Sequence, residues 1–257
     1  MDNLEILSTV DAIVVEEGMQ LLESKSGHSD AKPQNIYRIY NSAIKAKSNF
    51  GQQIMLAKEN TSECMRICYG NARAAKIIFT SEASSQNVMT LQSYLSFLGK
   101  IDVLGPSGEL LGRVDENLSM SSSLNVTNES GQTLFKIRGP VCICDCASLC
   151  HPVCDCGDVN FEVTSETTDS TVATIQKQWG QFAKMDATDG DNFSITFHDE
   201  DLDAKEKALL LGSLFLVHLL YFEANGRCKN LDIFVICLYP CPHYRFRCYP
   251  YRLGLVA

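Results

Sequence analysis

Acidic side chains are concentrated in one stretch of the chain, Asp186–Asp203, where they surround a short apolar run. Oxygen donors at this density are typical of a Ca²⁺ site, because Ca²⁺ takes six to eight oxygen ligands. Asp199, Asp201 and Asp203 have the spacing of the first three ligands of an EF-hand loop, but Ala204 stands where that loop needs glycine. The other interpretation is a solvated turn whose carboxylates favour the N-terminus of a following helix.

Cysteine is the second chemically suggestive residue type, and half of the 12 cysteines fall within Cys142–Cys156. The first ten residues contain Asp2 and Glu5 and no basic residue, so we expect no secretory signal, a cytosolic origin and reduced thiols. Three interpretations stay open, namely lipidation sites, a zinc site and plain thiols. The candidate residues are Cys142, Cys144, Cys146, Cys150, Cys154 and Cys156.

Other chemistries are disfavoured by charge and by spacing. The chain has 22 Lys and Arg against 31 Asp and Glu, for a net charge of −9. Such a chain lacks the basic field that holds phosphate backbones, so we expect no nucleic acid as its main ligand. No Ser/His/Asp or Cys/His set stands at a recognisable spacing, so we predict a protein without covalent catalysis and not an enzyme.

The pattern in the middle of the chain predicts a repeated β-hairpin. Short apolar runs alternate with polar turns, and the turn at Gly105–Gly108 matches that at Asn128–Gly131 when the chain is shifted by 23 residues. The same shift pairs Leu111 with Leu134 and Val114 with Ile137, and weaker matches extend the pattern in both directions. Repeated hairpins expose strand edges unless they close. The sequence therefore predicts a mainly β fold, a closed antiparallel barrel of about 10–12 strands.

One apolar segment, Ala208–Phe222, lacks the alternation of a strand and contains no charged residue. It predicts a helix of roughly 22 Å, shorter than the ~30 Å hydrocarbon core of a bilayer. Two interpretations stay open, a helix that fills the barrel and a helix inserted in a membrane. The positions expected to face the core or the membrane are Ala208, Leu211, Phe215, Leu219 and Phe222.

Four ordered blocks give the chain a family resemblance, and together they are more specific than any one motif. The chain resembles the phospholipid scramblases. Trp179 also stands where that family has a tryptophan. The blocks are Leu4–Leu22, Asn49–Gly70, Ile137–Val163 and Asp189–Glu223.

The resemblance implies a Tubby-like fold, a closed barrel around a central hydrophobic helix, and Ca²⁺-activated, ATP-independent, bidirectional movement of phospholipids between bilayer leaflets. It implies a membrane-associated protein, most simply at the cytoplasmic face of the plasma membrane. The stretch that carries palmitoylated cysteines in relatives corresponds to Leu91–Gly99, which contains no cysteine. The cysteines at 142–156 would then be the palmitoylated ones. The implied Ca²⁺ ligands are Asp191, Asn192, Asp199, Asp201 and Asp203.

Two other functions remain open. One is a Tubby-like module at the membrane surface that recruits protein partners or lipid without moving lipid. The other is a zinc-binding adaptor built on the cysteines. We expect one domain at residues 1–223 and a poorly ordered tail rich in Cys and Tyr at residues 224–257.

Overall fold

The fold is taken from a computed structural model of the whole chain. The structure describes residues 3–22, 32–41, 51–62, 73–96, 98–117, 122–140, 159–177 and 192–222.

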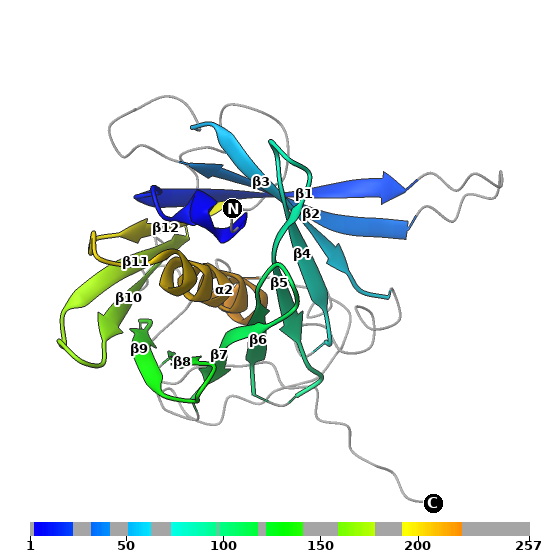
Figure 1. The fold of residues 1–257 in the computed structure, drawn as a ribbon. Coiled ribbons are helices and arrows are strands. Elements are labelled where there is room, and N and C mark those ends of the chain that lie inside the picture. Colours follow the sequence, from blue (N-terminus) through cyan, green and yellow to red (C-terminus); the bar gives the residue numbers. More distant parts are fainter. Residues whose placement is uncertain are drawn as a thin grey trace, which may run out of the picture.

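These residues form twelve strands, a short 3-10 helix and one α-helix (Figure 1). The strands alternate inward apolar and outward polar side chains, as the burial along β7 and β11 illustrates. The elements are the 3-10 helix η1 (Asn3–Leu7), β1 (Ala12–Leu22), β2 (Lys32–Asn41), β3 (Gln53–Asn60), β4 (Lys76–Ser81), β5 (Asn87–Ser93), β6 (Lys100–Leu104), β7 (Leu110–Glu116), β8 (Ser123–Asn128), β9 (Thr133–Arg138), β10 (Val159–Ser165), β11 (Thr171–Lys177), β12 (Asn192–Phe197) and α2 (Ala204–Tyr221).

The sheet is closed, which confirms the predicted barrel. Each strand pairs antiparallel with its neighbours in sequence, and β1 closes the circle against β12, with Ala12 opposite Thr196 and Val15 opposite Phe193. Closure leaves none of the described strands at an open edge, so the sheet needs no other edge protection.

The predicted repeat is present in the central hairpins. β6–β7 and β8–β9 have equivalent turns, in which Gly108 (φ 88°) and Gly131 (φ 82°) take the left-handed conformation that glycine adopts without strain. In each turn the glycine N–H bonds the carbonyl three residues earlier, of Gly105 or Asn128. The repeated apolar position is buried in four strands, at Leu91, Val114, Ile137 and Ile175.

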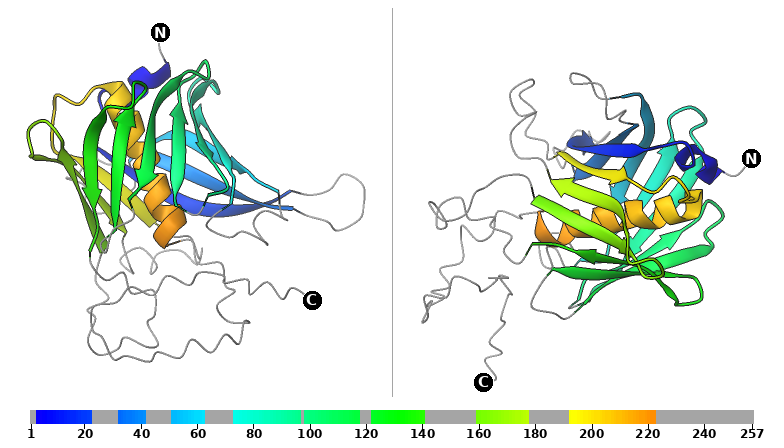
Figure 2. Two further views of the ribbon diagram at one scale, coloured as in Figure 1. Left: turned by 90° about the horizontal axis from the view of Figure 1, so that it is seen from below. Right: turned by 90° about the vertical axis from the view of Figure 1, so that its left-hand side faces the viewer.

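The interior of the barrel is filled by α2, whose residues are buried from Lys207 to Leu219 (Figure 2). Because strands surround it, the helix is apolar on all sides and has no single apolar stripe. A Cβ built at Gly212 would lie 2.6 Å from a methyl carbon of Val103, so glycine permits the close approach of helix and β6. Of the two predicted environments for Ala208–Phe222, the structure shows the barrel interior, with Ala208, Leu211, Phe215, Leu219 and Phe222 all buried.

The described part of the chain contains no helix that combines the length and the apolar character needed to cross a bilayer. The first turn of α2 carries Lys205, Glu206 and Lys207, and only the remaining residues are uncharged.

Candidate functional site

The two ends of the barrel differ, and α2 defines them. The helix begins after β12 and ends beside β7, where the Tyr221 hydroxyl lies 3.3 Å from Glu116 Oε1. We call these the helix N-terminal end and the helix C-terminal end. Figure 2 shows η1 at the first of them. Lys207 Nζ holds η1 there by donating to the carbonyls of Ser8 (2.8 Å) and Val10 (3.0 Å).

The predicted acidic turn lies at the helix N-terminal end and is organised by its own hydrogen bonds. Asp203 is the N-cap of α2, and its Oδ1 accepts from the Glu206 N–H at 2.7 Å. The Glu206 carboxylate accepts from the Asp203 N–H at 3.1 Å, which completes a capping box. Asp199 Oδ1 accepts from the Asp201 N–H at 3.0 Å. The turn therefore has a structural role in starting the helix.

Negative charge is nevertheless crowded in this turn. Burial, together with the charges of Asp203 and Asp199, raises the pKa of the Glu206 carboxyl, although the hydrogen bond from the Asp203 N–H opposes the shift. Burial of the Glu206 carboxyl is the larger cause of this shift, and repulsion from Asp203 and Asp199 adds to it. A bound cation would relieve this repulsion.

The implied Ca²⁺ ligands that lie within the described residues are not brought together. Asn192 starts β12 at the helix C-terminal end, whereas Asp199, Asp201 and Asp203 follow β12 at the other end. At about 3.3 Å per residue, β12 separates the two groups by roughly 17 Å. One Ca²⁺ ion holds its oxygens at about 2.3–2.6 Å, so the two groups cannot share an ion. Asp191 lies outside the described residues.

Within the described ranges, no three His, Cys, Asp or Glu side chains are arranged to hold a metal ion. The six cysteines of the 142–156 cluster, Trp179 and the tail 224–257 also lie outside the described residues. Lipidation, zinc binding and tail disorder therefore stay predictions.

The helix C-terminal end contains a buried ion pair that the sequence does not reveal. Arg73 contacts Glu59 through two hydrogen bonds, from Nε to Oε1 (2.9 Å) and from an Nη to Oε2 (3.1 Å), and both side chains are buried. Asn35 adds a third donor to Glu59 at 3.0 Å. The paired, fully engaged charges offset the cost of burying them inside the barrel. These residues are far apart in sequence, and the pairing of β2 with β3 and of β3 with β4 brings them together.

His218 lies close to the same end and is buried on the central helix. Its Nε2 is 3.1 Å from Glu17 Oε2, and its ring stacks on Phe193 with centroids 4.3 Å apart. These contacts are those of a histidine that packs in the core of the barrel. Lys177 lies nearby, with Nζ 5.2 Å from the centroid of the Phe222 ring.

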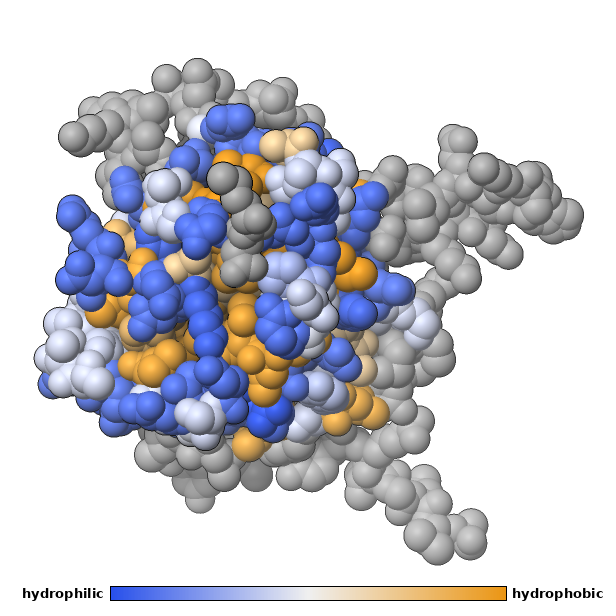
Figure 3. Space-filling model, in the orientation of Figure 1, coloured by the Kyte–Doolittle hydropathy of each residue, from blue (hydrophilic) through white to orange (hydrophobic). Residues whose placement is uncertain are grey.

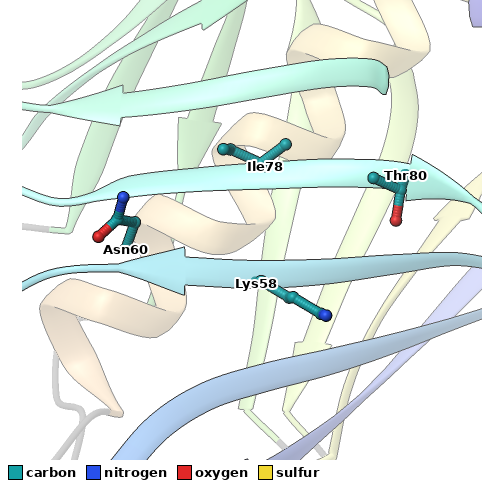
Figure 4. Close-up of a pocket in the computed structure, with 4 residues that line it drawn as sticks. All are labelled: Lys58, Asn60, Ile78 and Thr80. Carbon is teal, nitrogen blue, oxygen red and sulfur yellow. The ribbon is translucent and has the colours of Figure 1, made fainter. Parts of the chain in front are cut away.

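A shallow pocket lies on the outer wall of the barrel, over β3 and β4 (Figure 4). Its lining is Lys58, Asn60, Ile78 and Thr80, which lie on the outward side of strands whose alternate residues Ala57 and Phe79 are fully buried. It has neither a convergent set of titratable groups nor contact with the helix.

Comparisons with known proteins give a consistent result. A family model described as Scramblase matches residues 1–224. Human phospholipid scramblase 1 is 32% identical over an alignment of 232 residues, and the match covers 87% of this chain and 66% of that protein. Human phospholipid scramblase 2 is 31% identical over 229 residues, covering 86% of this chain and 70% of that protein. Human phospholipid scramblase family member 5 is 28% identical, and the match covers 86% of this chain and 77% of that protein. No solved structure matches.

The chain spans slightly less than two thirds of the length of phospholipid scramblase 1 from human, mouse and rat, at 66%, 64% and 63% of those proteins.

Proposed function

The chain belongs to the scramblase family, and we propose that it moves phospholipids between the two leaflets of a bilayer. The observation that carries the proposal is the family match over residues 1–224, which includes every strand of the barrel and the central helix. Lipid transfer between leaflets breaks no covalent bond, so the proposal needs no catalytic nucleophile. A protein that only lowers the barrier to this transfer needs no ATP, and it speeds the movement of lipid in both directions.

Ca²⁺ activation is the second part of the proposal. It is supported by the density of carboxylates between residues 186 and 203, three of which, Asp199, Asp201 and Asp203, share one turn before α2. Since β12 separates the implied ligands, we assign Ca²⁺ sensitivity to the described turn that contains Asp199, Asp201 and Asp203. Asn192 and Asp191 would act independently of it.

The protein would work at a membrane surface, and we place it at the cytoplasmic face of the plasma membrane. Palmitoylation within Cys142–Cys156 would add acyl anchors, and zinc binding by the same thiols is the competing proposal. Hydroxylamine-sensitive acyl labelling and metal analysis of the purified protein separate these two uses of the cluster.

The test is a liposome assay with the full chain and a fluorescent phospholipid, measured with Ca²⁺ and with a chelator. We expect Ca²⁺ to accelerate equilibration of the label over protein-free liposomes. Substituting Asp199→Asn and Asp201→Asn should raise the Ca²⁺ concentration for half-maximal rate by about tenfold, because each loses a charged oxygen ligand.

Asp169→Asn is the matched control, since Asp169 lies at the same end of the barrel and its φ of 52° suits asparagine. It should leave the Ca²⁺ response unchanged. No Ca²⁺-dependent rate in the unmodified chain would contradict the proposal. An equal shift in Asp169→Asn would show only a general charge effect, and would contradict the assignment to the turn.

A second function is favoured by one observation, the enclosure of α2. A helix surrounded by strands cannot itself contact lipid, which suits a Tubby-like module that holds lipid or protein partners at the membrane without moving lipid. Such a module would bind the same liposomes and give no label equilibration at any Ca²⁺ concentration.

A further inference from the structure

His218 differs from the other side chains of the helix that fills the barrel. Between Ala208 and Phe222 it is the one residue that can gain a positive charge near neutral pH. Figure 3, which looks onto the helix N-terminal end, shows hydrophobic residues in the middle of that face and hydrophilic residues around them. His218 lies in the last turn of α2, at the other end, and is only 1% exposed. The charge of the helix beyond its first turn therefore depends on one buried ring.

The neutral form of this ring gains little from its polar surroundings. Nε2 of His218 lies 3.1 Å from Glu17 Oε2, but the carboxylate oxygen is not in line with a ring N–H. Neither ring nitrogen has a hydrogen-bond partner among the described residues, although buried polar atoms are as a rule hydrogen-bonded. Glu17 can therefore attract the ring mainly through charge, and this attraction requires a protonated ring.

Three features of the position stabilise a positive charge on the ring. The first is the Glu17 carboxylate of β1. The second is Phe193 of β12, which stacks on the ring at an interplanar angle of 11°, so that its aromatic face can attract a cation. The third is the place of His218 in the last turn of α2, where the helix dipole favours positive charge. Burial acts in the opposite sense, because a charged ring loses more hydration than a neutral one.

The other carboxylates at this end have their own contacts. Glu59 of β3 accepts two hydrogen bonds from Arg73. Glu116 of β7 accepts from the Tyr221 hydroxyl at 3.3 Å. Glu17 is thus the carboxylate that the structure places against the ring.

Tyr37 and Lys177 are the remaining titratable groups on the strands around His218. Tyr37 of β2 meets the ring edge to face, with centroids 6.1 Å apart, so it adds packing and no charge at neutral pH. Lys177 of β11 is the described cation that would oppose a charge on His218. Its Nζ lies over the ring of Phe222, which follows His218 by about one helical turn. Glu17, at 3.1 Å, is the nearer charge and has the attractive sign.

We propose that His218 and Glu17 form a pH-dependent latch between the central helix and β1. In acid the imidazolium and the carboxylate attract each other and hold the C-terminal half of α2 against the strand. As the pH rises through the range in which histidine loses its proton, this attraction is lost and the packing on Phe193 remains. The inference goes beyond the proposed function, because it concerns how the helix is held and not what the protein does to lipid.

A double-mutant cycle with Glu17→Gln and His218→Gln, made in the full chain, tests the latch. Unfolding by denaturant is measured for the four proteins at about pH 5.5 and about pH 8.5, on either side of the histidine range. The coupling between the two sites should change the unfolding equilibrium constant by about tenfold at the lower pH and by less than about twofold at the higher pH. Effects of pH on charges elsewhere cancel in the cycle.

Glu16→Gln is the matched control for Glu17→Gln. Glu16 is the preceding residue of β1 and lies 3.4 Å from Arg38, on the outer wall of the barrel. A cycle of Glu16→Gln with His218→Gln should show no coupling at either pH. Coupling of equal size at Glu16 and Glu17 would overturn the proposal, because the effect would then come from the charge of β1 in general.

Hydrogen exchange of Glu17→Gln alone keeps the latch testable if His218→Gln does not fold. Relative to the unmodified chain, amide protection in the last two turns of α2 should fall by about threefold or more in acid and change little at high pH. Amides of the first two turns are the internal reference. Coupling or protection that is independent of pH would overturn the proposal, and so would an effect that grows as the pH rises. Neither measurement involves lipid, so failure of the proposed function would leave both results unaffected.

Discussion

Replacing Phe215 with alanine is expected to lower the free energy of unfolding by about 3–5 kcal/mol. Phe215 is fully buried at the centre of α2 and makes edge-to-face contacts with three rings. Its centroid lies 5.0 Å from Tyr37, 5.1 Å from Phe79 and 5.6 Å from Phe193. The cavity would lie between helix and strands, where the closed sheet limits relaxation. Chemical denaturation monitored by circular dichroism measures the loss.

Phe215→Leu is the conservative control for this substitution. It keeps most of the apolar volume and should lose about half as much stability or less. If Phe215→Ala unfolded at the same denaturant concentration as the unmodified chain, the helix could not be enclosed by the strands.

Removing one partner of the buried ion pair should have a comparable effect. Arg73→Met leaves the Glu59 carboxylate without its two guanidinium hydrogen bonds in a fully buried position, and we expect a loss of about 3–5 kcal/mol. Asn35 would still donate one hydrogen bond, but an amide does not neutralise the charge. The measurement is again the denaturation midpoint, at neutral pH.

The double variant Glu59→Gln with Arg73→Met isolates the electrostatic part of that loss. It removes both charges and should recover most of the stability, because the cost comes from a buried carboxylate that has lost its arginine and not from the loss of the arginine side chain itself. A double variant that is less stable than Arg73→Met would contradict this explanation.

The barrel could be predicted from the sequence because its signal is local and repeated. The turns at Gly108 and Gly131 and the alternation around Val114 and Ile137 each specify a hairpin without reference to the rest of the chain. The environment of Ala208–Phe222 could not be chosen in the same way. Its uniform apolarity fits both a bilayer and a protein interior, and only closure of β1 against β12 places it inside.

The candidate site was less predictable because it depends on where strands end. Asn192 and Asp199 are close in sequence, but β12 is extended between them and carries them to opposite ends of the barrel. Conversely, Glu59, Arg73 and Asn35 carry no motif, yet three neighbouring parts of the sheet bring them into contact. Charge density along a chain therefore predicted the presence of an acidic surface and not its geometry.

Enclosure of the central helix constrains how the protein could act on lipid. With the helix buried among the strands, its own side chains are unavailable to acyl chains, and contact with a bilayer must involve the outer wall or an end.

The most direct test of this view locks the helix in the barrel and asks whether lipid still moves. A Cβ built at Gly212 would lie 3.9 Å from the Cβ of Val103, within the range of disulfides, where about 3.8 Å is average. Val103→Cys with Gly212→Cys would also remove the methyl carbon that crowds Gly212. Gly212→Cys alone, oxidised in the same way, controls for the native thiols.

The measurement is the rate of phospholipid equilibration in Ca²⁺-containing liposomes, before and after reduction of the crosslinked protein. We expect the oxidised double variant to move lipid as fast as its reduced form, because α2 stays inside the closed sheet throughout. Loss of lipid movement in the oxidised form, restored by reduction, would contradict this expectation and show that the helix leaves the barrel to act.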